Sequence, residues 1–216
     1  MKTDLQIQQD VIAELKREPK INAAHIGVEV KNGVVTLSGH VDHYAEKWAA
    51  EDAAKRVAGV KIIAIEIDVI LPTSSKKSDT EIAYAVQNAL KWNIYNLSNN
   101  ISVKVEDGLV TLAGSVEWHY QKDSAENSVR FLTGVRGVFN NITVKPKISV
   151  LTVMADIEKA LKRRAHDDAQ EITVDVNGDE VTLGGKIHNW SEKNLAIDAA
   201  WGVPGVKKVI DKTRFI

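Results

Sequence analysis

Two sets of lysines recur at matching positions along the chain, and their ammonium groups could bind an anionic partner. The first set lies near the end of a predicted helix and comprises Lys16, Lys91 and Lys162. The second set lies in the first turns of another predicted helix and comprises Lys47, Lys122 and Lys193. Lysines that share one surface attract anionic lipid headgroups. The alternatives are a favourable interaction with the helix dipole for the first set and a solvated helix face for the second.

Aromatic side chains gather where this second helix begins, and they could form a contact surface. They are Tyr44, Trp118, His119, Tyr120 and Trp190. Aromatic groups with a polar edge suit a membrane interface or a protein contact, so our site hypothesis combines them with Lys47, Lys122 and Lys193 as a lipid- or partner-binding surface. Packing between repeats is the favoured alternative for the aromatic side chains. Trp92 and Tyr95, which follow the core of a first helix, invite the same two interpretations.

The sequence contains no recognisable catalytic or metal-binding set. It has no cysteine, which excludes a disulfide framework, thiol catalysis and a thiolate metal site. His40 and His43 are three residues apart, but neither of the other two repeats has a histidine at the equivalent positions. No phosphate-binding glycine pattern is present either. We therefore predict no metal, no cofactor and no enzymatic activity.

The composition is that of an ordinary soluble globular protein. The chain has 216 residues, of which 44% are hydrophobic and 26% are charged. Its formal net charge is −1, so no global basic field attracts a nucleic acid. The length suits two or three small domains rather than one.

The first ten residues and the apolar runs decide what is expected about membranes and compartment. Polar residues from Asp4 to Asp10 interrupt the continuous apolar run that a secretory signal needs. No apolar stretch approaches the length that spans a bilayer. We therefore expect a cytoplasmic protein without a transmembrane segment if Met1 is the natural start, and a periplasmic protein if a signal sequence has been removed.

Apolar periodicity predicts the order helix, strand, strand, helix, strand in the first third of the chain. The helices are expected over about 4–17 and 43–58, and the strands around 26–31, 35–39 and 63–69. Asp4 is the expected N-cap of the first helix, and Leu5 and Leu15 belong to its expected apolar face. Asn32-Gly33 is a strong signal for a two-residue hairpin turn.

The same pattern is written three times, which decides the architecture. Val35-Thr36-Leu37-Ser38-Gly39 returns at 110–114 and again at 181–185. An offset of 75 residues relates the first two repeats and one of 71 relates the second and third. In the third repeat the turn glycine moves by one place, to Gly178, without changing the repeat length. We predict an α+β protein with three tandem α-β-β-α-β units, each a three-stranded sheet covered by two helices, in domains 1–71, 77–146 and 149–216.

This pattern resembles the BON domain family, which is named for bacterial osmotically induced and nodulation-associated proteins. The shared marks are V-T-L-x-G, a G-x-V step such as Gly39-His40-Val41, an alanine-bearing helix, and a closing G-V-x-x-V such as 59–63. The chain is similar to the osmotically inducible members of the family. The glycines of these marks are predicted to be structural rather than ligand-binding: Gly39, Gly114, Gly185, Gly59, Gly134 and Gly205.

The resemblance implies a non-enzymatic bacterial binding or scaffold module, linked to phospholipid, the cell envelope and osmotic stress. An anionic phospholipid surface is the expected partner. One alternative is a protein–protein scaffold or homo-oligomer that uses the aromatic loops. Another is a sensor of a small ion, because a potassium-binding bacterial protein carries a BON domain.

Overall fold

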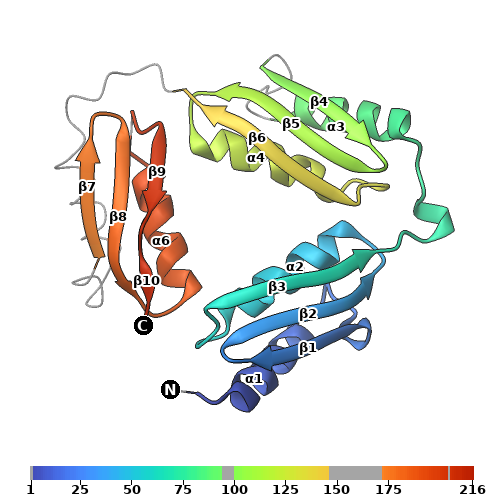
Figure 1. Cartoon of the computed structure of the whole chain (residues 1–216). Coiled ribbons are helices and arrows are strands. Elements are labelled where there is room, and N and C mark those ends of the chain that lie inside the picture. Colours follow the sequence, from blue (N-terminus) through green and yellow to red (C-terminus); the bar gives the residue numbers. More distant parts are fainter. Residues whose placement is uncertain (1, 94–99, 146–171, 204) are drawn as a thin grey trace. The chain divides into compact units, whose positions relative to one another are not determined.

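The computed structural model describes residues 2–93, 100–145, 172–203 and 205–216 (Figure 1). It confirms the α+β class and the repeated unit, because helices and small mixed sheets follow one another three times along the chain. The chain divides into two compact units, Met1–Val116 with Tyr120–Thr143, and Glu117–His119 with Val144–Ile216. The domain boundaries expected from the sequence stay predictions.

The first repeat forms a three-stranded sheet in the order β1-β2-β3. Strands β1 and β2 are antiparallel, whereas β2 and β3 are parallel and joined through a helix. Its elements are α1 (Asp4–Arg17), η1 (Ala23–His25), β1 (Ile26–Lys31), β2 (Val34–Val41), α2 (Tyr44–Arg56) and β3 (Ile62–Val69).

The N-cap of the first helix lies one residue earlier than expected. Thr3 is the N-cap, since its hydroxyl accepts from the N–H of Gln6 while the Gln6 side chain accepts from the N–H of Thr3. The prediction that Asp4 caps the helix is therefore wrong. The Asp4 carboxylate instead accepts from the amides of Asn32 and Gly33 at 2.8 and 3.1 Å, so it ties the helix to the hairpin turn.

The core of the first repeat lies between the helices and the sheet. Val11 and Leu15 of α1 and Leu37 of β2 are buried. The second helix meets this core through small side chains, Ala50, Ala53 and Ala54 among them, which let its backbone lie close to the sheet. Leu5 was expected on the apolar face of α1, but it is 63% exposed.

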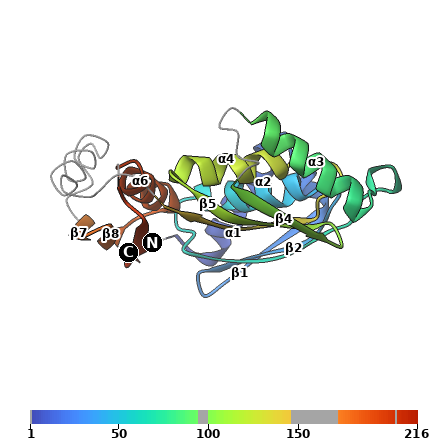
Figure 2. The same ribbon diagram turned by 90° about the horizontal axis from the view of Figure 1, so that it is seen from above.

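The second repeat has the same topology and the same pairing register 75 residues later. Its sheet runs in the order β4-β5-β6, and Figure 2 shows α3 and α4 along one face of β4 and β5. Its elements are α3 (Asp79–Trp92), β4 (Ile101–Glu106), β5 (Leu109–Val116), α4 (His119–Val129) and β6 (Gly137–Val144), and the short helix η2 (Thr73–Ser75) precedes them. Ile82, Val86 and Leu90 of α3 are buried as the equivalent residues of α1 are.

The third repeat departs from the other two in its last strand. Two short pieces, β9 and β10, both pair parallel to β8 and replace a single strand. The described elements are β7 (Ile172–Asn177), β8 (Glu180–Ile187), α6 (Trp190–Trp201), β9 (Lys208–Asp211) and β10 (Arg214–Phe215). The expected first helix of this repeat, with Lys162, lies outside the described residues.

The hairpin turns confirm that the third repeat moves its glycine by one place. Asn32 and Gly33 both have positive φ, 52° and 77°, as a type I′ turn requires. Pairing of Asn177 with Glu180 places Gly178 and Asp179 in the third turn. The first residue of this turn, Gly178, has a φ of 64°. It replaces Asn32 and Asp107, which adopt a positive φ at the same place in the other two repeats.

The glycine that ends the second strand lets two segments of backbone come close together. Gly39 has a φ of 118°, and a Cβ there would lie 2.1 Å from the carbonyl oxygen of His25. Gly114 has a φ of 136°, and its Cβ would lie 2.0 Å from the carbonyl oxygen of Asn100. The position therefore has a structural requirement for glycine in both repeats.

Candidate functional site

Two lysines of the second-helix set are engaged within their own repeats. The ammonium of Lys47 donates to the carbonyl oxygen of Ile67 on β3 at 2.7 Å. That of Lys193 lies 2.5 Å from the Asp211 carboxylate on β9, and its side chain is 20% exposed. Burial opposes ionisation of Asp211, but the bonds from Lys193 and Thr213 outweigh it and lower the pKa of this carboxyl. Each lysine therefore ties its helix to the third strand.

The second repeat makes the corresponding tie with a different side chain. The amide nitrogen of Asn140 on β6 donates to the main-chain oxygen of Lys122 and to the Glu126 carboxylate, each at 3.1 Å. Helix-to-strand contacts thus occur at this place in all three repeats, which explains in structural terms why polar residues recur there. A binding role for Lys47, Lys122 and Lys193 stays a prediction.

The aromatic residues of the site hypothesis are mostly packed. Tyr44 contacts the core of the first repeat, and burial, together with the charge of Glu126, raises the pKa of its phenol. Trp190 lies 5.2 Å from Phe215 between ring centroids. His119 stacks on Trp201 at 4.4 Å. Trp118 is half-buried and Tyr120 is 49% exposed.

A buried arginine packs against another aromatic ring in the first compact unit. Arg130 is only 7% exposed, and its guanidinium lies 4.1 Å from the centroid of the Trp48 ring. It also donates to the Glu126 carboxylate at 3.0 Å. The aromatic face and the carboxylate offset part of the free-energy cost of removing this charge from water.

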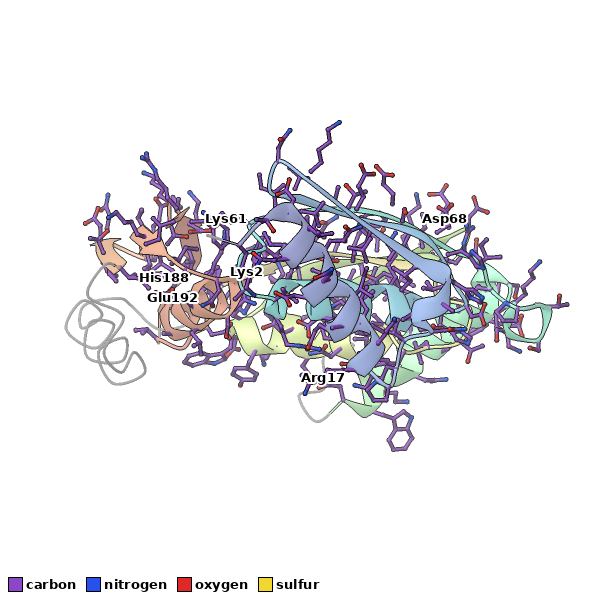
Figure 3. The ribbon with its side chains drawn as sticks, turned by 90° about the horizontal axis from the view of Figure 1, so that it is seen from below. Lys2, Arg17, Lys61, Asp68, His188 and Glu192 are labelled. Carbon is purple, nitrogen blue, oxygen red and sulfur yellow. The ribbon has the colours of Figure 1, made fainter. Side chains whose placement is uncertain are left out.

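At the ends of its two helices, the first repeat carries a charged network. Arg56 of α2 donates to two carboxylates at the end of α1, at 3.1 Å for Glu14 and 3.2 Å for Glu18. It also donates to Asp52, one turn back on its own helix, at 2.6 Å. Arg17, labelled in Figure 3, is the last residue of α1. This end of the first repeat is therefore covered by ion pairs.

The second repeat replaces every member of that network by an uncharged residue. Adding 75 converts the members of the network, Glu14, Glu18, Asp52 and Arg56, into Ala89, Asn93, Asn127 and Phe131. It also converts Arg17, the last residue of α1, into Trp92. Trp92 is 83% exposed and Phe131 is 58% exposed. Exposed Lys91 is retained from the first repeat, where Lys16 is its equivalent.

The ends of the two helices of the second repeat lie together. Asn93, which caps α3, donates through its side chain to Ser124 and Ser128 of α4 at 2.9 and 2.8 Å. Phe131 follows Ser128 by three residues, and Trp92 immediately precedes Asn93. We refer to Lys91, Trp92 and Phe131 as the helix-end patch.

The sequence reading singled out Lys91 and Trp92 but missed Phe131. A comparison of each charged residue of the first repeat with the residue 75 positions later would have identified Phe131, because it shows that uncharged residues replace the ion network in the second repeat. Tyr95 and Lys162, which were part of the same reading, lie outside the described residues.

Metal-ligand clusters and membrane-spanning helices are absent from the part of the chain that the structure describes. No group of three or more His, Asp or Glu side chains in it could hold a metal ion. His40 stacks on His25, with ring centroids 4.8 Å apart. No helix among the described residues has both the length and the apolar character needed to cross a bilayer. Figure 3 shows His188 and Glu192 on the third repeat, where the Nδ1 atom of His188 lies 3.2 Å from the Glu192 carboxylate.

Two bacterial proteins are similar to this chain over about two thirds of its length. Osmotically-inducible protein Y of Escherichia coli is 31% identical over 146 residues, which cover 66% of this chain and 73% of that protein. The outer membrane lipoprotein DolP of Haemophilus influenzae is 28% identical over 152 residues, which cover 67% of this chain and 78% of that protein.

Similarity to solved structures is weak. CdsD, a structural protein of the type III secretion system of Chlamydia trachomatis, is 15% identical, and the match covers 96% of this chain and 91% of that one with a TM-score of 0.26. The periplasmic domain of PrgH is 11% identical, with coverages of 89% and 95% and a TM-score of 0.24. Scores this low carry no argument about fold or function.

The family assignment rests on the match to the BON domain. Residues 3–70, 78–146 and 151–216 each match the model of this domain. These segments account for most of the chain, and the structure has the order helix, hairpin, helix, strand in the first two of them. The chain therefore belongs to the BON domain family and carries three copies of the domain.

Proposed function

We propose that this chain is a non-enzymatic BON protein of the bacterial envelope that binds anionic phospholipid through the helix-end patch. Its two curated relatives are an osmotically inducible protein and an outer membrane lipoprotein, which supports an envelope and stress setting. The observation that carries the proposal is Trp92, 83% exposed beside Lys91 at a helix end from which the charges of the first repeat are missing.

The chemistry of the patch suits the boundary between headgroups and acyl chains. Tryptophan prefers this boundary, and Phe131 adds a second exposed ring. Lys91 contributes the attraction to an anionic surface. The equivalents of three first-repeat carboxylates are neutral here, so no acid at these positions repels the surface. Partial burial of two aromatic rings contributes about 2–4 kcal/mol, which predicts weak and reversible binding.

Vesicle flotation tests the proposal with the full chain. We expect it to float with vesicles that contain phosphatidylglycerol, to float less with phosphatidylcholine alone, and to be released by salt. The double variant Trp92→Ala/Phe131→Ala should stay at the bottom of the gradient. Phe139→Ala is the matched control, because Phe139 is 54% exposed on β6 and alternates with Asn140 and Ile142, which face the helices. Equal loss with this control would contradict the assignment.

A transplant of the first-repeat network gives a second test that does not remove bulk. The variant Ala89→Glu/Phe131→Arg places charged residues where the first repeat has Glu14 and Arg56, and it keeps Asn93, whose side chain donates to Ser124 and Ser128. We expect flotation to be lost while the melting temperature stays unchanged or rises slightly, since an exposed ion network contributes about 1 kcal/mol or less. Undiminished flotation would remove the helix-end patch as the lipid site.

The residues at the starts of the second helices are the competing surface. Lys122→Glu tests them in the second repeat, because Lys122 is the equivalent there of Lys47 and Lys193. If Lys122→Glu abolishes flotation and the Trp92→Ala/Phe131→Ala variant does not, the binding surface lies at the second-helix starts. The proposal predicts the reverse.

A further inference from the structure

The second repeat leaves one edge of its sheet open. Strand β4 is the outer strand in the order β4-β5-β6, and its register against β5 is that of β1 against β2. In the first repeat the Val28 carbonyl points away from β2, because it accepts from the Gln8 side chain at 2.7 Å. Residues alternate in direction along an antiparallel strand, so Val103 and Val105 direct their main-chain groups to the open edge of β4.

The first repeat closes this edge and the second does not. Gln8 is the residue that covers Val28, and its equivalent in the second repeat is Ala83, which has no donor to place there. A groove of about 510 Å³ lies between α3 and β4 instead. Ala83, Tyr84 and Gln87 line it from the helix, and Val103 and Val105 line it from the strand. Tyr84 is 65% exposed.

The charges along β4 are complementary to a second copy of the same strand. Lys104 and Glu106 occupy the face of the strand that points away from the groove, with side chains 70% and 69% exposed. Within one chain the two side chains form an exposed 2.7 Å ion pair, so pairing with a second copy would exchange this contact in each copy for two contacts between the copies. An antiparallel pair of β4 strands centred on Val105 sets Lys104 of each copy opposite Glu106 of the other. The same register pairs the main-chain N–H and C=O groups of the two Val105 residues. Opposite charges directly across an antiparallel pair are favourable.

We propose that two copies of this chain associate through β4 in this register, joining their second-repeat sheets into one continuous sheet. The contact is isologous, so every favourable interaction occurs twice and the assembly closes as a dimer.

The other two repeats lack one requirement each. In the first, the charges are present in reverse order as Glu29 and Lys31, but Gln8 occupies the carbonyl that a partner strand would approach. In the third, the equivalents of Lys104 and Glu106 are Asp175 and Asn177, so no reciprocal ion pair forms. Among the strands that the structure describes, β4 combines an open edge with a self-complementary charge pattern.

Sedimentation of the full chain over a concentration series, without vesicles, tests the proposal. The wild type should pass reversibly from one copy to two as the concentration rises. Lys104→Glu and Glu106→Lys each convert two attractions into two repulsions and should weaken the dimer by about tenfold or more. The double variant Lys104→Glu/Glu106→Lys should restore the wild-type dissociation constant, which a contact with any unrelated partner surface would not do.

Three matched variants complete the test, with far-UV circular dichroism to confirm folding. Ala83→Gln should weaken the dimer by closing the edge as Gln8 does, whereas Glu29→Lys at the equivalent place in the first repeat should leave it unchanged. Trp92→Ala should also leave it unchanged, so failure of the lipid proposal is distinguishable. A wild type that stays monomeric at every concentration overturns the proposal, and so does a dimer that the charge reversals do not weaken or that their combination does not restore.

Discussion

The first and second repeats share a topology and a register, yet they present opposite chemistry at the ends of their helices. Arg56 holds Glu14 and Glu18 in the first repeat, whereas Phe131 and Trp92 stand exposed in the second. The inward-facing positions hardly differ between the repeats, since Val11, Leu15 and Leu37 become Val86, Leu90 and Leu112. The difference teaches that the two repeats agree at the positions that form the core and differ at exposed positions on their helix ends.

The glycine that ends the second strand is common to the first two repeats, and substituting it should lower stability more than any other change considered below. Gly114→Ala places a Cβ 2.0 Å from the carbonyl oxygen of Asn100 at a φ of 136°, and Gly39→Ala meets the same obstacle at His25. We expect each variant to lower the free energy of unfolding by about 3 kcal/mol or more, measured by chemical denaturation of the full chain.

A large loss of stability for only one of these two variants would contradict the conclusion that the glycine has the same role in both repeats. Gly33→Ala provides a control, because no atom lies within 4 Å of a Cβ built there although its φ is also positive. Its cost should be limited to backbone strain of about 1 kcal/mol. A loss as large as that of Gly114→Ala would show that strain rather than contact decides the position.

The strands and turns show how much of the fold a single sequence can predict. Alternation and turn chemistry located the strands, because V-T-L-x-G needs only local preferences to be recognised. The role of Asp4 was predicted wrongly because Asp is favoured both at an N-cap and in the first turn of a helix. Only its contact with the hairpin turn, 28 residues away, distinguishes the two roles. The division of β9 from β10 left no mark in the apolar pattern.

The candidate sites were harder to foresee than the fold. Lys47 and Lys193 recur as a binding set would, but their acceptors, Ile67 and Asp211, are distant in sequence. The exposure of Trp92 depends on what packs over the end of α3, which helical periodicity does not state. Ala83 carries no signal by itself, and its meaning appears only beside Gln8, once the helix is known to lie against the strand edge.

The carboxylate that ties the first helix to the hairpin should have the next largest effect. Asp79 accepts from the amides of Asp107 and Gly108, both at 2.9 Å, as Asp4 does in the first repeat. Asp79→Ala and Asp4→Ala should each cost about 1–2 kcal/mol, because two hydrogen bonds to a charged acceptor are lost. Denaturation measures the loss, and faster amide exchange at Gly108 locates it.

The third repeat is a natural control for this tie. Its residue at the equivalent position is Val150, which lies outside the described residues and has no carboxylate. Val150→Asp should therefore add less stability than Asp79→Ala removes, because the third turn begins with Gly178 and needs less support. A gain as large as the loss would mean that the turn type is irrelevant to the tie.

The smallest expected effect is a difference in pH dependence between the N-terminal caps of α1 and α3, because one cap is neutral and the other is charged. The first repeat closes its capping box with neutral Gln6, whereas the second uses Glu81. The Glu81 carboxylate accepts from the main-chain N–H and the hydroxyl of Ser78 at 2.9 and 2.8 Å and lies 3.3 Å from the Lys77 ammonium. These bonds lower its pKa from 4.5 to about 2.

A pKa that is lower in the folded state contributes stability above the unfolded value and loses it as the pH falls. The cap of α3 should therefore weaken between pH 4.5 and about 2, while the neutral cap of α1 should not respond. Glu81→Gln should reduce the acid sensitivity of the chain slightly, and Gln6→Glu should increase it by a similar amount. Nuclear magnetic resonance titration of the Glu81 carboxyl measures the midpoint directly. A midpoint near 4.5 would mean that the charged cap contributes nothing, and the two repeats would then differ in their surfaces but not in the way their first helices begin.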